Sequence, residues 1–187
     1  MFQPRFFMIA FALLSIGSEP ARAGSDVAAD VKKPDNVCHL VNQAAINTRK
    51  TKVYRETISI IEPDGSAKFF QEGRMTATGS FAKLNANSKW QKMPGPVPAV
   101  TEYPRYTSCT YVDNTEGPHF RAYWHNRGRR YETAIADVWL TPDLEKLRKT
   151  VRQFYANDPK FPSQTLLAVF DYDAEHAKPP APEETMP

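Results

Sequence analysis

The chain has 187 residues, of which 41% are hydrophobic and 24% charged, so its composition is that of a globular protein rather than a disordered one. The formal net charge of +3 is too small to make nucleic acid the expected partner. The excess of prolines (16) over glycines (8) excludes collagen and disfavours long uninterrupted helices.

Residues 1–23 have the features of a secretory signal peptide. One arginine near the start precedes an apolar run over 6–16, and this run is too short to cross a bilayer core of about 30 Å. The Ala-Arg-Ala sequence at 21–23 provides the small residues that a signal peptidase requires, so we predict cleavage between Ala23 and Gly24. The mature chain is then expected to be periplasmic or secreted, with no transmembrane anchor after cleavage.

Cys38 and Cys109 are the only cysteines of the chain. In an oxidising compartment, an even pair predicts a disulfide, and closing a loop of this length would stabilise the fold by roughly 4 kcal/mol. The alternatives are a reactive thiol or a metal-binding pair, but neither cysteine belongs to a Cys-x-x-Cys motif. We therefore predict a structural disulfide.

The first half of the mature chain changes from helical to strand periodicity. Residues 24–36 are small and polar, and we expect them to form a flexible lead-in. Residues 37–48 carry apolar side chains at helical spacing, which predicts a short helix. Alternation with a period of two then predicts a hairpin formed by 53–61 and 67–81, followed by a short strand at 89–93.

The second half begins after a proline-rich segment. Four prolines between residues 94 and 104 exclude a helix or a central strand there, so this segment is expected to be a loop between two parts of the sheet. Alternating apolar and polar residues predict further strands at 107–112, 119–124, 129–140 and 164–172.

Two segments of the second half have other patterns. Residues 142–156 fit a helical first turn followed by a strand, with Thr141 as the helix cap, or a hairpin turn followed directly by a strand. We favour the helical first turn. Residues 176–187 are rich in proline and glutamate and are expected to be a disordered tail.

Together these elements predict one mainly β domain of the α+β class over residues 37–175. Its expected architecture is a curved antiparallel sheet or half-barrel of about seven to nine strands, with one or two helices. One face of this sheet should collect large apolar side chains, which form either a filled core or an apolar groove for a ligand. These residues are Tyr54, Ile58, Phe69, Phe81, Trp124, Trp139 and Phe170.

Positive charge is concentrated around one predicted turn near residue 128. Arg121, Arg127, Arg129 and Arg130 lie among aromatic residues there, which makes this turn a candidate contact for an anionic envelope surface. The alternative is a basic hairpin tip that prevents the sheet edge from pairing with other sheets.

Residues suited to catalysis or metal binding are few and scattered. His119 and His125 lie roughly 20 Å apart on one predicted strand, which is too far to share a metal ion. Asp171 and Asp173 share a face and fit a carboxylate pair or a cation site, but their position near the chain end favours a solvated edge. We therefore predict no catalytic residue, no metal and no cofactor.

The order of these landmarks resembles the exported lipoprotein-sorting and lipoprotein-carrier superfamily. The shared features are the leader, the short helix with Cys38, a strand ending in the sequence Lys-Trp-Gln-Lys-Met-Pro at 89–94, Cys109 at the start of the second half, and the strand ending at 170–173. The resemblance implies a half-barrel with an apolar groove and no catalysis. The chain is shorter than the dedicated carriers and lacks a clear counterpart of their long helical lid.

The expected function is that of an exported soluble binding protein. Its apolar groove would take lipid or lipoprotein acyl chains, and it would not be an enzyme. The alternative is an envelope-associated structural or interaction protein with a filled core, acting through the basic hairpin. Nucleic acid is not an expected partner in either case.

Overall fold

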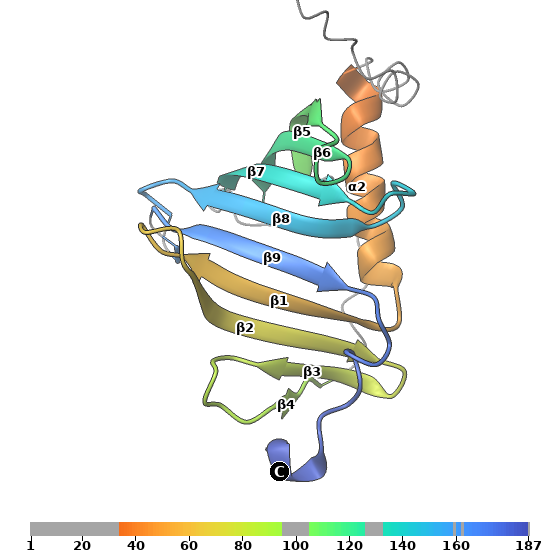
Figure 1. The fold of residues 1–187 in the computed structure, drawn as a ribbon, viewed down its shortest axis with the longest axis vertical. Helices are drawn as coiled ribbons and strands as arrows, with labels where there is room; N and C mark the ends of the chain where they lie inside the picture. The colour runs from red at the N-terminus through yellow and green to blue at the C-terminus, as the bar shows by residue number, and fades with distance from the viewer. Residues whose placement is uncertain (1–33, 95–104, 126–132, 159, 162, 187) are drawn as a thin grey trace, which may run out of the picture.

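The computed structural model describes residues 34–94, 105–125, 133–158, 160–161 and 163–186 (Figure 1). The predicted signal peptide and most of the predicted lead-in lie outside these ranges. The central part of the proline-rich loop and the predicted anion-contact residues Arg127, Arg129 and Arg130 also lie outside them.

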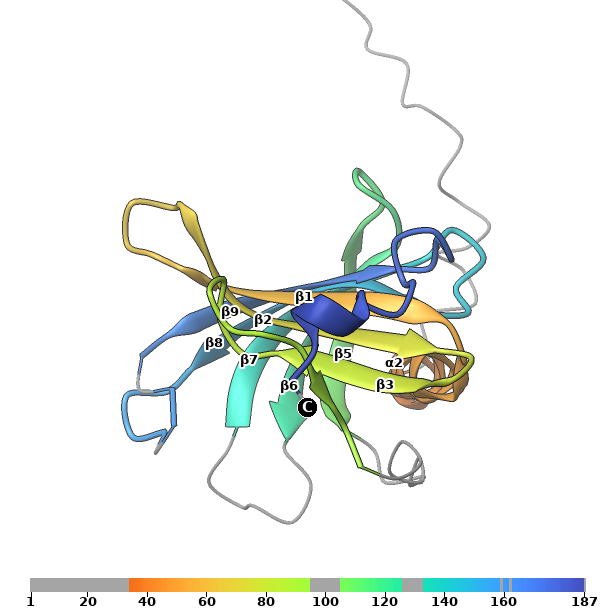
Figure 2. The same ribbon diagram turned by 90° about the horizontal axis from the view of Figure 1, so that it is seen from below.

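The described residues form one open, fully antiparallel sheet of nine strands, which confirms the predicted fold class. The strands are β1 Tyr54–Ile61, β2 Ala67–Thr76, β3 Gly79–Lys83, β4 Gln91–Lys92, β5 Tyr106–Asp113, β6 His119–His125, β7 Thr133–Leu140, β8 Leu147–Phe154 and β9 Thr165–Asp171. Their order across the sheet is β4-β3-β2-β1-β9-β8-β7-β6-β5, so the first and last strands pair at the centre. The sheet is curved, and helix α2 lies on its concave side (Figure 2).

Helix α2 (Pro34–Lys50) crosses one end of the concave face (Figures 1 and 2). Its apolar stripe of Val37, Val41 and Ala44 is buried against the sheet, mainly against β5 and also against β7 and β8. Within the described part of the chain, no helix is long and apolar enough to cross a membrane.

Two polar side chains of α2 fix its position on the sheet. The hydroxyl of Thr48 accepts a hydrogen bond from the Leu147 amide at the start of β8, at 2.8 Å. Asn42 exchanges hydrogen bonds with the backbone of Tyr106 at the start of β5, at 2.8 and 3.0 Å. Because these backbone groups would otherwise be buried without partners, the two contacts specify where the helix packs.

The predicted disulfide between Cys38 and Cys109 is confirmed, with the two Cα atoms 5.0 Å apart. It joins the first turns of α2 to β5. A bulge in β5, with Ser108 at a positive φ of 51°, interrupts the pairing with β6 between Thr107 and Thr110. The extra residue turns Cys109 to the buried face, three positions after the buried Tyr106.

The prediction of a helical first turn in residues 142–156 is wrong. Residues 141–146 are instead a hairpin loop that leads directly into β8. The Thr141 hydroxyl accepts a hydrogen bond from the Lys146 amide, the Asp143 carboxylate accepts one from the Glu145 amide, and Leu144 adopts a left-handed conformation. Side-chain hydrogen bonds of this kind compete with helix formation. The pairing of β8 with β7 further favours the hairpin over the helix.

The tail expected to be disordered is placed as far as residue 186. Ala177 and Pro180 are buried, and a short 3-10 helix, η1 (Pro182–Glu184), precedes a bridge between Thr185 and Trp90. The Trp90 amide donates to the Glu184 carbonyl, and the Met186 amide donates to the Trp90 carbonyl, each at 2.8 Å. The tail is ordered because it satisfies backbone groups beside the short edge strand β4.

Candidate functional site

The seven large apolar residues predicted to share one face are divided between the two faces of the sheet. Tyr54, Trp124 and Phe170 belong to the buried cluster beneath α2, and Ile58 packs against that cluster. The strand register places the other three on the convex face: Phe69, Phe81 and Trp139. The expectation of a single seven-residue face is therefore wrong, and the concave face is defined by the first four.

An ion pair at the end of α2 occupies the concave face between the helix and β1. Arg49 donates two hydrogen bonds to the carboxylate of Glu56, at 2.7 and 3.2 Å, and a third to the Tyr54 hydroxyl at 3.1 Å. The Arg49 guanidinium also lies 5.7 Å from the centroid of the Phe170 ring. The Glu56 carboxylate is thereby fully engaged by one arginine.

A second arginine of the concave face has no such partner. Arg152 in β8 lies between Leu166 and Ala136 in the strand register, and its guanidinium lies 4.9 Å from the centroid of the Trp124 ring. Its Nε is buried without a hydrogen-bond partner.

Arg105, at the start of β5, adds a third positive charge near this pair of arginines. Its backbone amide donates to the Asn42 side chain at 2.7 Å, which holds the residue beside α2. Burial lowers the pKa of Arg105, and the charges of Arg49 and Arg152 lower it further. The neighbouring Tyr106 is fully buried, which raises the pKa of its hydroxyl.

The electrostatic balance of this arginine cluster (Arg49, Arg105 and Arg152 with Glu56) is therefore positive. Burial alone would raise the pKa of Glu56, but the charge and hydrogen bonds of Arg49 outweigh burial and hold that pKa below its usual value, with smaller effects from the other two arginines. Attraction to Glu56 raises the pKa of Arg49, whereas burial lowers that of Arg152. One carboxylate thus faces three cations.

Four aromatic side chains follow one another across the sheet from the end of β6 to β2. Ring centroids are 5.9 Å apart for Trp124 and Phe154, 5.2 Å for Phe154 and Phe161, and 5.7 Å for Phe161 and Phe70. We call these four residues the aromatic row. Trp124 and Phe154 lie at the ends of β6 and β8, whereas α2 contacts the start of β8 at Leu147. The row begins inside the buried cluster, because Trp124 pairs with Tyr106, which α2 contacts through Asn42. It ends at Phe161 and Phe70, which are half-buried.

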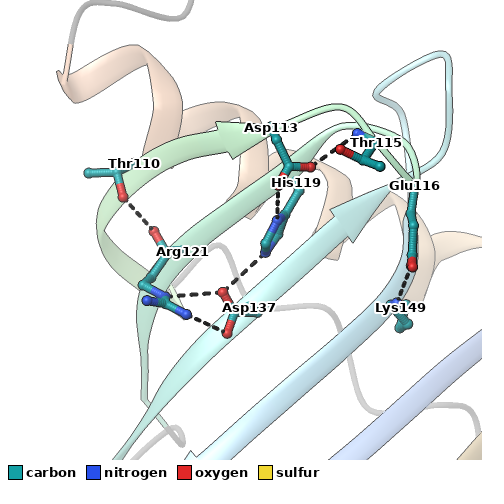
Figure 3. A network of polar contacts seen from close by, with 8 residues as sticks. All are labelled: Thr110, Asp113, Thr115, Glu116, His119, Arg121, Asp137 and Lys149. Atoms are coloured by element: carbon teal, nitrogen blue, oxygen red, sulfur yellow. Dashed lines mark hydrogen bonds and ion pairs between the residues drawn. The ribbon is translucent and has the colours of Figure 1, made fainter. Parts of the chain in front are cut away.

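The convex face carries a separate network of polar contacts (Figure 3). The His119 ring stacks on Trp139 at 4.1 Å between centroids and lies between Asp113 and Asp137, at 3.4 and 3.1 Å. Arg121, one of the four predicted anion-contact residues, donates two hydrogen bonds to Asp137, both at 3.1 Å. Its charge is thus paired with Asp137, although its side chain is 62% exposed, and the predicted contact with an anionic surface stays a prediction.

The first of the two aspartates at the chain end, Asp171, contacts an arginine and a histidine. Asp171 accepts hydrogen bonds from Arg55 at 2.8 Å and pairs with His176 at 2.7 Å, while the Asp173 amide donates to Asp171 at 3.0 Å. These contacts place Asp171 at the end of β9 and Asp173 in the turn that follows it. Among the described residues, no group of three or more side chains is arranged to hold a metal ion.

The arginine cluster was missed by the sequence analysis, although one signal was present. Glu56 is two residues from both Tyr54 and Ile58 and so lies on the same face of its strand as they do. Arg152 likewise shares a strand face with Thr150 and Phe154. Charged residues in a buried alternation are uncommon unless they are paired or bind something. Comparison of the sequence with protein-family models gives no match, and comparison with curated proteins gives none either.

Proposed function

We propose that the protein is an exported, non-enzymatic binding protein that holds the apolar chain of a lipid or similar amphiphile on the concave face of its sheet. The observation that carries the proposal is the uneven cover of this face. Helix α2 packs over one end, while Ile58, Ile60 and Phe161 at the other end are only half-buried. Half-buried apolar side chains that line a concave surface are a suitable contact for an acyl chain.

Two further features support export. Residues 1–23 have the pattern of a cleavable leader, and the Cys38–Cys109 disulfide is compatible with an oxidising compartment such as the periplasm. The fold also agrees with the half-barrel implied by the resemblance to lipoprotein carriers. Only one helix of the described residues covers the concave face, so the proposed ligand is a single chain rather than a whole lipoprotein.

Tryptophan fluorescence can test this proposal because the three tryptophans lie in different places. Trp124 is on the concave face, Trp139 is on the convex face, and Trp90 lies beside the edge strand. A variant with Trp90→Phe and Trp139→Phe keeps only Trp124. We expect terminally brominated dodecanol to quench its fluorescence with saturation.

The matched control keeps only Trp139 through Trp90→Phe and Trp124→Phe. Since Trp139 stacks on His119 on the convex face, the same alcohol should leave its fluorescence unchanged. Quenching of both variants to the same extent, or of neither, would contradict binding on the concave face.

A further inference from the structure

The concave face holds more positive charge than its own carboxylate can neutralise. Glu56 receives both of its short hydrogen bonds from Arg49, so it offers Arg152 and Arg105 only a more distant electrostatic attraction. Moving an unpaired charge out of water is costly, and proteins normally pair such a group or bind a counter-charge to it.

Arg152 is the residue where this imbalance is sharpest. A guanidinium carries five N–H donors in a planar fork and cannot give up its proton. The face of the Trp124 ring attracts the cation. It does not accept hydrogen bonds from the N–H groups, which point outward in the plane of the guanidinium. The Nε is buried without a partner, and the residue beside Arg152 on β7 is the apolar Ala136, which offers no side-chain acceptor.

The position of Arg152 also relates it to the apolar end of the face. Leu166 in β9 is the register partner of both Arg152 and Ile60, so Arg152 lies two strands from Ile60 in one row across the sheet. Two residues further along β8, Phe154 begins the contacts that lead through Phe161 to Phe70. Arg152, whose Nε has no hydrogen-bond partner, thus adjoins the buried Leu166 and Phe154, beyond which Ile60 and Phe161 are half-buried.

From this juxtaposition we propose that the ligand is an anionic single-chain amphiphile, whose carboxylate or phosphate head binds the guanidinium of Arg152, supported by the charge of Arg105, while its chain lies along Ile60 and the aromatic row. This inference rests on the proposed function and specifies the class of ligand. A planar carboxylate or a phosphate matches the fork of an arginine through two parallel hydrogen bonds.

The test compares chains that differ only in their head groups. Affinities for dodecanoate, dodecyl phosphate and dodecanol are measured by titration calorimetry on the wild-type protein and on Arg152→Met. The wild type should bind each anion at least about tenfold more tightly than the alcohol, because charge-assisted hydrogen bonds form only with the anions. In Arg152→Met this preference should disappear, while the affinity for dodecanol should change less than twofold.

A second variant controls for the loss of one positive charge. Arg148 lies on the same strand but is exposed and contacts the Glu116 backbone instead of the concave face. Arg148→Met should keep the full preference for the anions. Arg105→Gln should reduce the preference without abolishing it, and this variant keeps the proposal testable if Arg152→Met does not fold.

The outcomes separate this inference from the proposed function. Equal affinity of the wild type for dodecanol and the two anions would overturn the anionic head and leave the chain-binding proposal standing. Absence of binding by all three, together with no quenching of Trp124, would overturn both. Inorganic phosphate is the control ligand that has an anionic group but no chain. If it bound through Arg152 as tightly as dodecyl phosphate does, the role of the chain would be overturned.

Discussion

The guanidinium of Arg152 lies 4.9 Å from the ring centroid of Trp124, and its Nε has no hydrogen-bond partner. The neighbouring Arg49, in contrast, is bound to Glu56 through two hydrogen bonds. Two arginines on the same concave face therefore differ in their electrostatic environment. The difference leads to opposite expectations for the stability of their variants.

Replacing Arg152 should not destabilise the ligand-free protein. Arg152→Met removes a charge that lacks a partner and keeps a side chain of similar length against Trp124, so the free energy of unfolding should stay equal or rise by about 1–3 kcal/mol. Urea unfolding followed by far-UV circular dichroism measures this change. A loss of more than about 1 kcal/mol would mean that the contact with Trp124 mainly supports the fold.

Replacing Arg49 should have the opposite effect. Arg49→Met leaves the Glu56 carboxylate, whose side chain is 13% exposed, without its hydrogen-bond donors. The free energy of unfolding should fall by about 3 kcal/mol. This is the low end of the range for breaking a buried ion pair, because the Arg49 side chain is 33% exposed. The same urea unfolding experiment applies, and a double variant with Glu56→Gln should recover part of the loss.

The Arg49–Glu56 pair should also make stability dependent on pH. The pKa of Glu56 is lower in the folded protein than in the unfolded chain, so its contribution is present above the unfolded value of about 4.3. This contribution is lost as the pH falls through the lower folded value. The stability difference between wild type and Glu56→Gln should therefore be largest near neutral pH and shrink below about pH 4. A difference that is constant between pH 7 and pH 3 would contradict this assignment.

The disulfide should contribute strongly to stability because it joins α2 to β5. Cys38 and Cys109 are 71 positions apart, and removal of this cross-link in Cys38→Ser with Cys109→Ser should cost roughly 4 kcal/mol. Thermal unfolding of the wild type with and without reductant measures the same quantity independently. Similar melting temperatures in the two conditions would contradict a structural role.

The C-terminal segment should protect the edge of the sheet at β4. Deletion of residues 177–187 removes the backbone partners of Trp90, whose side chain is only 4% exposed. Fluorescence of Trp90 should then shift to longer wavelength, and the exposed edge should increase self-association measured by light scattering. The control is Trp90→Phe in the full-length and the truncated protein. Truncation should then cause no fluorescence shift, but it should still increase self-association.

Much of the architecture follows from local patterns in the sequence. Alternation in residues 133–140 predicts strand β7, although Trp139 lies on its convex face and not on the predicted apolar face, and the apolar spacing of residues 37–48 predicts most of α2. The two cysteines predict the disulfide because a leader precedes them. These features depend on residues close together in the chain.

The facing of the large apolar residues depends instead on irregularities that the sequence does not reveal. A bulge in the pairing of β1 with β2, between Ile58 and Ser59, reverses the facing of Phe69 relative to Gln71. The turn between β2 and β3 pairs Met75 with Ser80, so Phe81 faces away from Met75 despite their even separation. The arginine cluster combines residues of α2, β1, β8 and the start of β5, which only the strand order brings together.

A crystal structure of the protein with dodecanoate would test the central claim most directly. We predict that the carboxylate lies about 2.7–2.9 Å from the guanidinium nitrogens of Arg152, with the chain against Ile60 and Phe161. A chain on the concave face whose carboxylate points into solvent, or dodecanoate bound only outside that face, would contradict the account.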